Sequence, residues 1–174
     1  MIQIRKNVFE TNSSSTHSLV ISKKDRGYDY NLPVDEGGIL TISFGEFGWG
    51  PQILNTPLDK ISYVITDQGY EVNDVFNEKD ALELAIVERV INLIKEKCPA
   101  VKEVKIKPAS IYYPYGYVDH QSTGTSQEDA DLEHLIFSKD VIILIDNDND
   151  YQFEDYFPDY WEGAPAKKDI EELF

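Results

Sequence analysis

The segment NEKDALELAIVERVINLIKEKC, residues 77–98, carries the clearest helical pattern in the chain. Asn77 is a residue type that caps the first turn of a helix, and Pro99 follows where a helix has to stop. Apolar side chains recur between these two residues at the spacing that brings them onto one helical face. They are Leu82, Ile86, Val90, Leu93 and Ile94. The pattern predicts one long helix over 77–98 whose apolar stripe packs against a core.

Short runs of β-branched residues on both sides of this helix predict strands. The predicted strands span 18–22, 39–44, 61–66, 101–107 and 141–145, with a tyrosine-rich strand over 111–118 that lies at an edge or bends at Pro114 and Gly116. The run over 141–145 is apolar throughout, as in a central strand buried on both faces. Shorter helices are predicted over 127–138, capped by Ser126, and over 167–174. These elements predict an α+β fold in a single domain, residues 1–174, with a mixed or antiparallel sheet, one long helix and one or two shorter ones.

The composition predicts a protein of the bacterial cytoplasm, in a producing or infected cell. The 174 residues are 41% hydrophobic and 12% aromatic, which is typical of a folded core. No apolar run follows the basic pair Arg5 and Lys6, so no signal peptide is predicted. The longest apolar run, over 141–145, is too short to span a bilayer. Cys98 is the only cysteine, which excludes an internal disulfide, and no metal and no cofactor are predicted.

Charge is the strongest global signal in the sequence. There are 16 basic and 32 acidic residues, and the formal net charge is −16. Such a chain is repelled by free nucleic acid and by anionic membranes, so neither is an expected partner. It is attracted to basic surfaces, including the nucleic-acid-binding groove of a nuclease. The alternative is that the charge serves solubility alone. The oligomeric state is left open.

Residues 146–162, which we call the acidic-aromatic segment, contain seven acids and no lysine or arginine. Acids spaced among aromatic rings could imitate a phosphate track and also supply apolar anchors at an interface. The predicted binding residues are Asp146, Asp148, Asp150, Glu154, Asp155, Asp159, Tyr160, Trp161 and Glu162. The alternative is an acidic surface strand and loop whose aromatic rings turn into the core.

The polar run ETNSSSTHS, residues 10–18, is a second candidate site. Hydroxyls and exposed backbone N–H groups can hold a phosphate, and the predicted phosphate-binding residues are Asn12, Ser13, Ser14, Ser15 and Thr16. His17 could act as an acid or a base near neutral pH. The run lacks the glycine and lysine of a P-loop, and a serine-rich turn is the alternative.

A third candidate, Asp119-His-Gln-Ser122, follows the tyrosine-rich strand. A carboxylate beside an imidazole could orient the His120 ring as a base, and the alternative is a turn leading into the next helix. Paired with His17, His120 could support phosphodiester or nucleotidyl chemistry. Ser122 or Glu10 is a candidate third member of that catalytic group.

Two further features concern a loop and a possible cation site. The glycine-rich loop over 45–50 carries Trp49, which either contacts a partner or covers the core. The run over 146–150 resembles the start of a calcium loop. However, Tyr151 replaces the glycine and Phe157 the bidentate glutamate of that motif, so no EF-hand is predicted.

Several blocks together resemble a family of uncharacterised proteins from phages and mobile elements of Firmicutes. The blocks span residues 4–19 with the motif FETNSSSTHS, 45–49, 60–63, and 116–122 with the motif DHQS. The resemblance implies a phage-associated accessory setting and favours the two polar segments as sites. By analogy of charge and setting, we expect an anti-CRISPR-like nucleic-acid mimic that binds and inhibits a basic host or defence nuclease. The alternative is an enzyme that acts on a phosphodiester or nucleotide.

Overall fold

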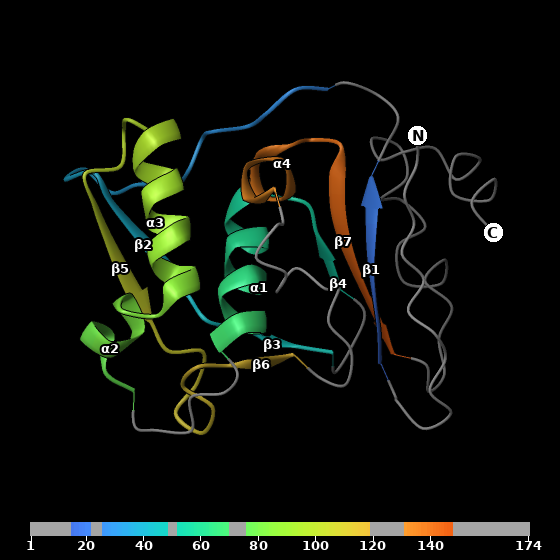
Figure 1. The fold of residues 1–174 in the computed structure, drawn as a ribbon. Helices are drawn as coiled ribbons and strands as arrows, with labels where there is room; N and C mark the ends of the chain where they lie inside the picture. Colours follow the sequence, from blue (N-terminus) through green and yellow to red (C-terminus); the bar gives the residue numbers. More distant parts are fainter. Residues whose placement is uncertain (1–14, 22–25, 49–51, 70–75, 119–130, 148–174) are drawn as a thin grey trace.

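The computed structural model describes residues 15–21, 26–48, 52–69, 76–118 and 131–147. Within these ranges the chain forms four helices and seven strands, which confirms the predicted α+β class. The strands make three small sheets in place of one (Figure 1). One sheet has three antiparallel strands, and the other two are parallel pairs.

Strand β7, Val141–Asn147, is the central strand of the three-stranded sheet, in the order β1-β7-β4. Strands β1, Ser15–Ile21, and β4, Gln52–Leu54, both pair with it in the antiparallel direction. Ile143 and Ile145 are fully buried, so the central strand predicted over 141–145 is confirmed. The strand predicted over 18–22 is also confirmed, although it begins three residues earlier.

The second sheet is a parallel pair of β2, Ile39–Ser43, and β5, Glu103–Lys107, both at predicted positions. In β5 the lysines at 105 and 107 are exposed while Ile106 is buried, which is the predicted half-buried alternation. The backbone N–H of Ile106 donates to the Glu78 carboxylate at 3.1 Å. A helix side chain thereby covers part of the β5 edge.

The strand predicted over 61–66 is wrong, because these residues form the middle of helix α1, Pro57–Gly69. The start of α1 explains the error. The Thr56 hydroxyl accepts the Asp59 backbone N–H at 3.2 Å, and Pro57 occupies the first helical position, where its missing N–H costs nothing. This start signal outweighs the strand preference of Ile61, Val64 and Ile65.

The long helix predicted over 77–98 is interrupted. It forms α2, Glu78–Leu82, and α3, Ala85–Lys97, with a break at Glu83 and Leu84. The cap at Asn77 is confirmed, since its side chain accepts the Lys79 backbone N–H at 3.0 Å. The predicted stripe survives in α3. Its members Ile86, Val90 and Ile94 are buried, whereas Leu93 is half-buried. Val87, which was not predicted as part of the stripe, is buried as well.

Only the C-terminal part of the helix predicted over 127–138 lies within the described residues, and it is helical there. Helix α4 spans Leu132–Phe137, and the Asp131 side chain caps it by accepting the His134 backbone N–H at 3.0 Å. The predicted cap, Ser126, lies outside the described residues, as does the helix predicted over 167–174.

The tyrosine-rich strand predicted over 111–118 is wrong over most of its length. Only β6, Tyr117–Val118, is a strand, and it pairs in parallel with β3, Glu46–Phe47. The residues before β6 form turns, because Pro114 cannot donate to a strand ladder and Gly116 adopts a φ of 67°.

Helix α1 is the centre of the fold. It contacts α3, α4, β2 and β6, and Figure 1 shows it between α3 and the three-stranded sheet. Its Ile61, Tyr63, Val64 and Ile65 side chains are fully buried in one hydrophobic cluster that receives residues from all three sheets. Among the described helices, none has both the length and the apolar character needed to cross a membrane.

Candidate functional site at one end of the three-stranded sheet

The backbone pairing of β1 with β7 brings two predicted sites together. Ser15 lies opposite Asn147, and Thr16 lies opposite Asp146. The end of the polar N-terminal run and the start of the acidic-aromatic segment are therefore neighbours across the sheet. This end of the sheet is where β1 and β4 begin and β7 finishes, because both outer strands run antiparallel to β7.

The next row of this sheet joins His17, Ile145 and Gln52. Ile145 pairs with His17 on one side and with Gln52 on the other. Ile145 is fully buried, and the Oε1 atom of Gln52 is buried without a hydrogen-bond partner among the described residues.

Two more of the predicted segments, the glycine-rich loop over 45–50 and the segment over 119–122, adjoin the strands of the parallel pair β3–β6 in the sequence. Phe47 lies opposite Val118, so the chain leaves both strands in the same direction (Figure 1). Trp49 follows two residues after Phe47, and Asp119 directly follows Val118. Gln52 follows five residues after Phe47, and a chain of that length spans at most about 18 Å. The topology thus limits the distance between the Phe47–Val118 pair and the row that contains His17.

Most of the predicted site residues lie outside the described residues. For Ser15, Thr16, His17 and Asp146 the structure describes the backbone pairing given above. The predicted residues outside the described ranges are Glu10, Asn12, Ser13, Ser14, Trp49, Asp119, His120, Ser122, Asp148, Asp150, Glu154, Asp155, Asp159, Tyr160, Trp161 and Glu162.

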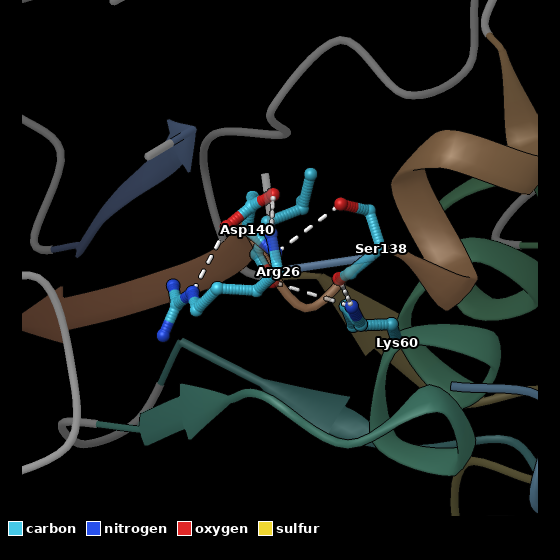
Figure 2. Close-up of polar contacts among 5 residues, drawn as sticks. Arg26, Lys60, Ser138 and Asp140 are labelled. Atoms are coloured by element: carbon cyan, nitrogen blue, oxygen red, sulfur yellow. Dashed lines mark hydrogen bonds and ion pairs between the residues drawn. The ribbon is translucent and has the colours of Figure 1, made fainter. Parts of the chain in front are cut away.

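The structure also contains a polar cluster that the sequence did not predict, at the turn between α4 and β7 (Figure 2). The side chain of Asp140, a residue that is 6% exposed, accepts two hydrogen bonds from Arg26. The backbone N–H and the Nε of Arg26 reach its two carboxylate oxygens, each at 2.9 Å. The Asp140 backbone N–H in turn donates to the Ser138 hydroxyl at 3.2 Å. These bonds fasten the strap of residues 26–30 onto the turn.

Lys60 of α1 reaches the same turn from below and is 1% exposed. Its Nζ donates to the carbonyl oxygens of Ser138 at 2.8 Å and Val141 at 3.2 Å (Figure 2). Burial lowers the pKa of the Lys60 amine from 10.5 to about 8, against the opposing effect of the Asp29 and Asp59 carboxylates.

A lysine with a lowered pKa can serve as a nucleophile, but the surroundings of Lys60 assign it another role. A nucleophile needs access to its substrate, whereas Lys60 is enclosed and bonded to two backbone carbonyls. It therefore connects α1 to the α4–β7 turn. The signal that could have identified it is the helix start at Thr56 and Pro57, which puts Lys60 on the buried side of a helix.

A surface cluster on the other side of the strap joins it to α3 and α4. The Tyr30 hydroxyl donates to Glu133 at 2.6 Å, and Lys97 forms an ion pair with the same carboxylate at 3.0 Å. The hydrogen bond to Glu133 raises the pKa of Tyr30 to about 12, and the two partners lower the pKa of Glu133. The Tyr28 ring stacks on Tyr30 at 5.8 Å. Each polar group here has a partner, so the cluster fastens the strap.

Metal-binding potential is absent from the part of the chain that the structure describes, where no group of three or more His, Cys, Asp or Glu side chains could hold an ion. In comparisons with known proteins, no family model, no curated protein and no solved structure matches the chain. The arguments below therefore rest on the sequence and on the geometry of the chain itself.

Proposed function

We propose that the protein is a phage-type accessory protein that binds and inhibits a basic host or defence nuclease, as anti-CRISPR proteins do. The observation that carries this proposal is the uneven distribution of charge along the chain. The described ranges contain 16 of the 32 acidic residues and ten of the 16 basic ones. The excess of acids over bases there is six, out of 16 for the whole chain. Residues 148–174 alone contain nine acids and two lysines.

The link to the fold supports an interface role for the acidic-aromatic segment. This segment begins at the end of β7, the central strand of the three-stranded sheet. A charged segment that is continuous with a rigid strand loses less conformational entropy on binding than one joined through a long flexible linker. Its acids would attract a nucleic-acid-binding surface, and its aromatic rings would supply contact area.

Neutralising four acids of the segment is expected to weaken binding to a basic nuclease at least about tenfold. The variant carries Asp148→Asn, Asp150→Asn, Glu154→Gln and Asp155→Asn. Affinity is measured by biolayer interferometry against a panel of purified nucleases with basic nucleic-acid channels, RNA-guided nucleases included. Cleavage is assayed in parallel. For the wild type, we expect the Kd to rise steeply between about 0.05 M and about 0.3 M salt, because the contact is screened by ions.

A matched control separates the segment from net charge. Glu36→Gln, Glu83→Gln, Glu88→Gln and Glu103→Gln change the net charge by the same amount at four exposed positions in the described part of the chain. We expect this control to bind as the wild type does. If the control loses as much affinity as the segment variant, or if the wild type binds no member of the panel, the proposal fails.

A second function is favoured by the register of β1 on β7. We propose as the alternative that the same end of the sheet acts on a phosphodiester or nucleotide. The supporting observation is the pairing of Thr16 with Asp146, which brings the end of the serine-rich run next to the start of the acidic-aromatic segment. In this case His17 and His120 would act as base and acid, with the serine-rich run holding the phosphate.

The two functions predict opposite results for the histidines. If the protein is an enzyme, His17→Ala and His120→Ala should each lower turnover by a factor of about 10² to 10⁴. Turnover is measured with a fluorogenic phosphodiester and a panel of nucleotides. Inhibition of a nuclease should persist in both variants under the first proposal. An absence of turnover by the wild type would eliminate the enzyme alternative.

A further inference from the structure

Three consecutive large side chains are exposed in the loop between β5 and β6. Ile111 is 87% exposed, Tyr112 is 81% exposed and Tyr113 is 57% exposed. We call residues 111–113 the anchor loop. Contact of apolar surface with water is unfavourable, and three such residues in succession form a contiguous patch that differs from scattered surface residues.

The anchor loop is held in its shape by hydrogen bonds at its base. The Ala109 backbone N–H donates to the Pro114 carbonyl oxygen at 2.9 Å. The Tyr113 backbone N–H donates to the Ser110 hydroxyl at 3.0 Å. The Gly116 backbone N–H donates to the Tyr113 carbonyl oxygen at 2.9 Å. These bonds fix the backbone on both sides of Ile111 and Tyr112, so binding would require little further ordering.

The chain just after the loop is rooted in the core. Tyr115 is 3% exposed, and its ring packs edge-on against Phe44 at 5.3 Å and lies 5.6 Å from Phe76. The Tyr113 ring contacts Tyr117 edge-on at 5.1 Å. The segment thus contains aromatic residues of two kinds, one buried and one presented to solvent. Because Tyr115 is packed in the core, the chain beside the loop is well ordered. The exposure of Ile111 and Tyr112 is therefore not a result of poor packing in this region.

The net charge decides what kind of partner fits this loop. A second copy of the chain, a nucleic acid and an anionic membrane would each be repelled by a net charge of −16. An isoleucine at the most exposed position also gains nothing from base stacking, whereas it gains from an apolar protein pocket. The occupant that remains is a protein with an apolar socket, and under the proposed function it is the same basic nuclease. Because Lys105 and Lys107 are exposed just before the loop, the socket lies away from the basic surface of that partner.

We propose that the anchor loop inserts into an apolar socket of the partner protein, apart from the basic surface that attracts the acidic-aromatic segment. This inference rests on the proposed function and divides the binding between two contacts. The acidic contact steers association and is screened by salt. The anchor contact is apolar and insensitive to salt, and it would act by slowing dissociation.

Site-specific cross-linking of the full chain tests the anchor loop and identifies the protein that it contacts. Tyr112 is replaced by the photoreactive p-benzoylphenylalanine, and the chain is irradiated in the cells that encode it and with each nuclease of the panel. The control carries the same photoreactive residue at Glu88, an exposed position on α3. We expect one discrete adduct from position 112 and none from position 88.

The protein found in the adduct is then purified, and its binding is measured. The wild type and Tyr112→Phe should bind it alike, because phenylalanine retains the ring. The double variant Ile111→Ser, Tyr112→Ser should bind about 30-fold more weakly, through faster dissociation at all salt concentrations. Circular dichroism of the double variant should match the wild type, since neither side chain is buried.

Two results would overturn the proposal in different ways. If no adduct forms at position 112, or if the adduct protein binds the double variant as tightly as the wild type, the proposal that the anchor loop contacts the partner protein is wrong. The proposed function then still stands, provided that the four-acid variant loses affinity for a nuclease. If the adduct protein is acidic, the basic partner is wrong, and the proposed function falls with it.

Discussion

Gly116→Ala is expected to lower the free energy of unfolding by about 2 to 5 kcal/mol, the largest effect that we predict for a single methyl group. Gly116 has a φ of 67°, a conformation that costs an L-residue roughly 1–2 kcal/mol. A Cβ atom there would also overlap the carbonyl oxygen of Gly45 and lie 2.9 Å from the Cγ2 of Thr66. Because the main overlap is with backbone, the β3–β6 pair has to shift, which adds a cost of roughly 1–3 kcal/mol.

Gly27→Ala is the matched control for this prediction. Gly27 has a φ of 74°, close to that of Gly116, but an added Cβ would meet nothing within 4 Å. We expect this variant to lose only the conformational cost, roughly 1–2 kcal/mol. Urea unfolding followed by circular dichroism measures both, and thermal unfolding of Gly116→Ala should shift downward by roughly 10 °C. Equal losses in the two variants would show that the close approach of Gly116 to Gly45 is not present in solution.

The positions of the strands could be predicted from the sequence better than the pairing between them. The runs over 39–44, 101–107 and 141–145 have composition and alternation that depend only on local sequence and burial, and all three are strands. The sequence did not predict that β2 pairs with β5 in parallel while β1 and β4 flank β7. These pairings join residues far apart in the chain, and the pattern within one strand does not specify which other strand it pairs with.

Two strand predictions were wrong, the one over 61–66 in α1 and the one over 111–116 before β6, and both errors have local causes. Ile61-Ser-Tyr-Val-Ile65 is rich in strand formers, but strand preference is weak and depends on context. The start signal at Thr56 and Pro57 was the stronger observation. Over 111–116, the alternation of tyrosines favoured a strand, whereas Pro114 and the left-handed Gly116 interrupt it.

The candidate site could be predicted as a set of residues but not as an arrangement. The polar run, the aspartate-histidine segment and the acidic-aromatic segment are conspicuous in the sequence. Their relation became visible only through the register that puts Thr16 opposite Asp146. Lys60, Arg26 and Asp140 were missed because each interacts with a turn more than 75 residues away in sequence or lies within that turn.

Lys60→Ala is expected to lower the free energy of unfolding by about 3 kcal/mol. The substitution leaves the buried carbonyl oxygens of Ser138 and Val141 without the Nζ donor and removes three methylene groups and the amine from the core. Lys60→Met is the control, because it keeps the volume of the side chain, removes the same donor and also removes the cost of burying an amine. We expect it to lose about 1 to 2 kcal/mol, as measured by urea unfolding. A loss below about 0.5 kcal/mol in Lys60→Ala would contradict the connecting role of this side chain.

The pH dependence of stability distinguishes the buried amine from a merely well-packed side chain. The Lys60 pKa is about 8 in the folded state and 10.5 as its ordinary value, so between these pH values the unfolded chain binds more protons. The stability of the wild type relative to Lys60→Met should therefore rise as pH increases from about 8 to about 10.5 and stay constant below pH 8. A neutral amine still has two N–H groups, one for each carbonyl oxygen, so deprotonation removes the cost of the charge while both hydrogen bonds persist. Parallel curves for the two proteins over this range would show that Lys60 is not buried as the structure has it, because tyrosines and the other lysines titrate alike in both.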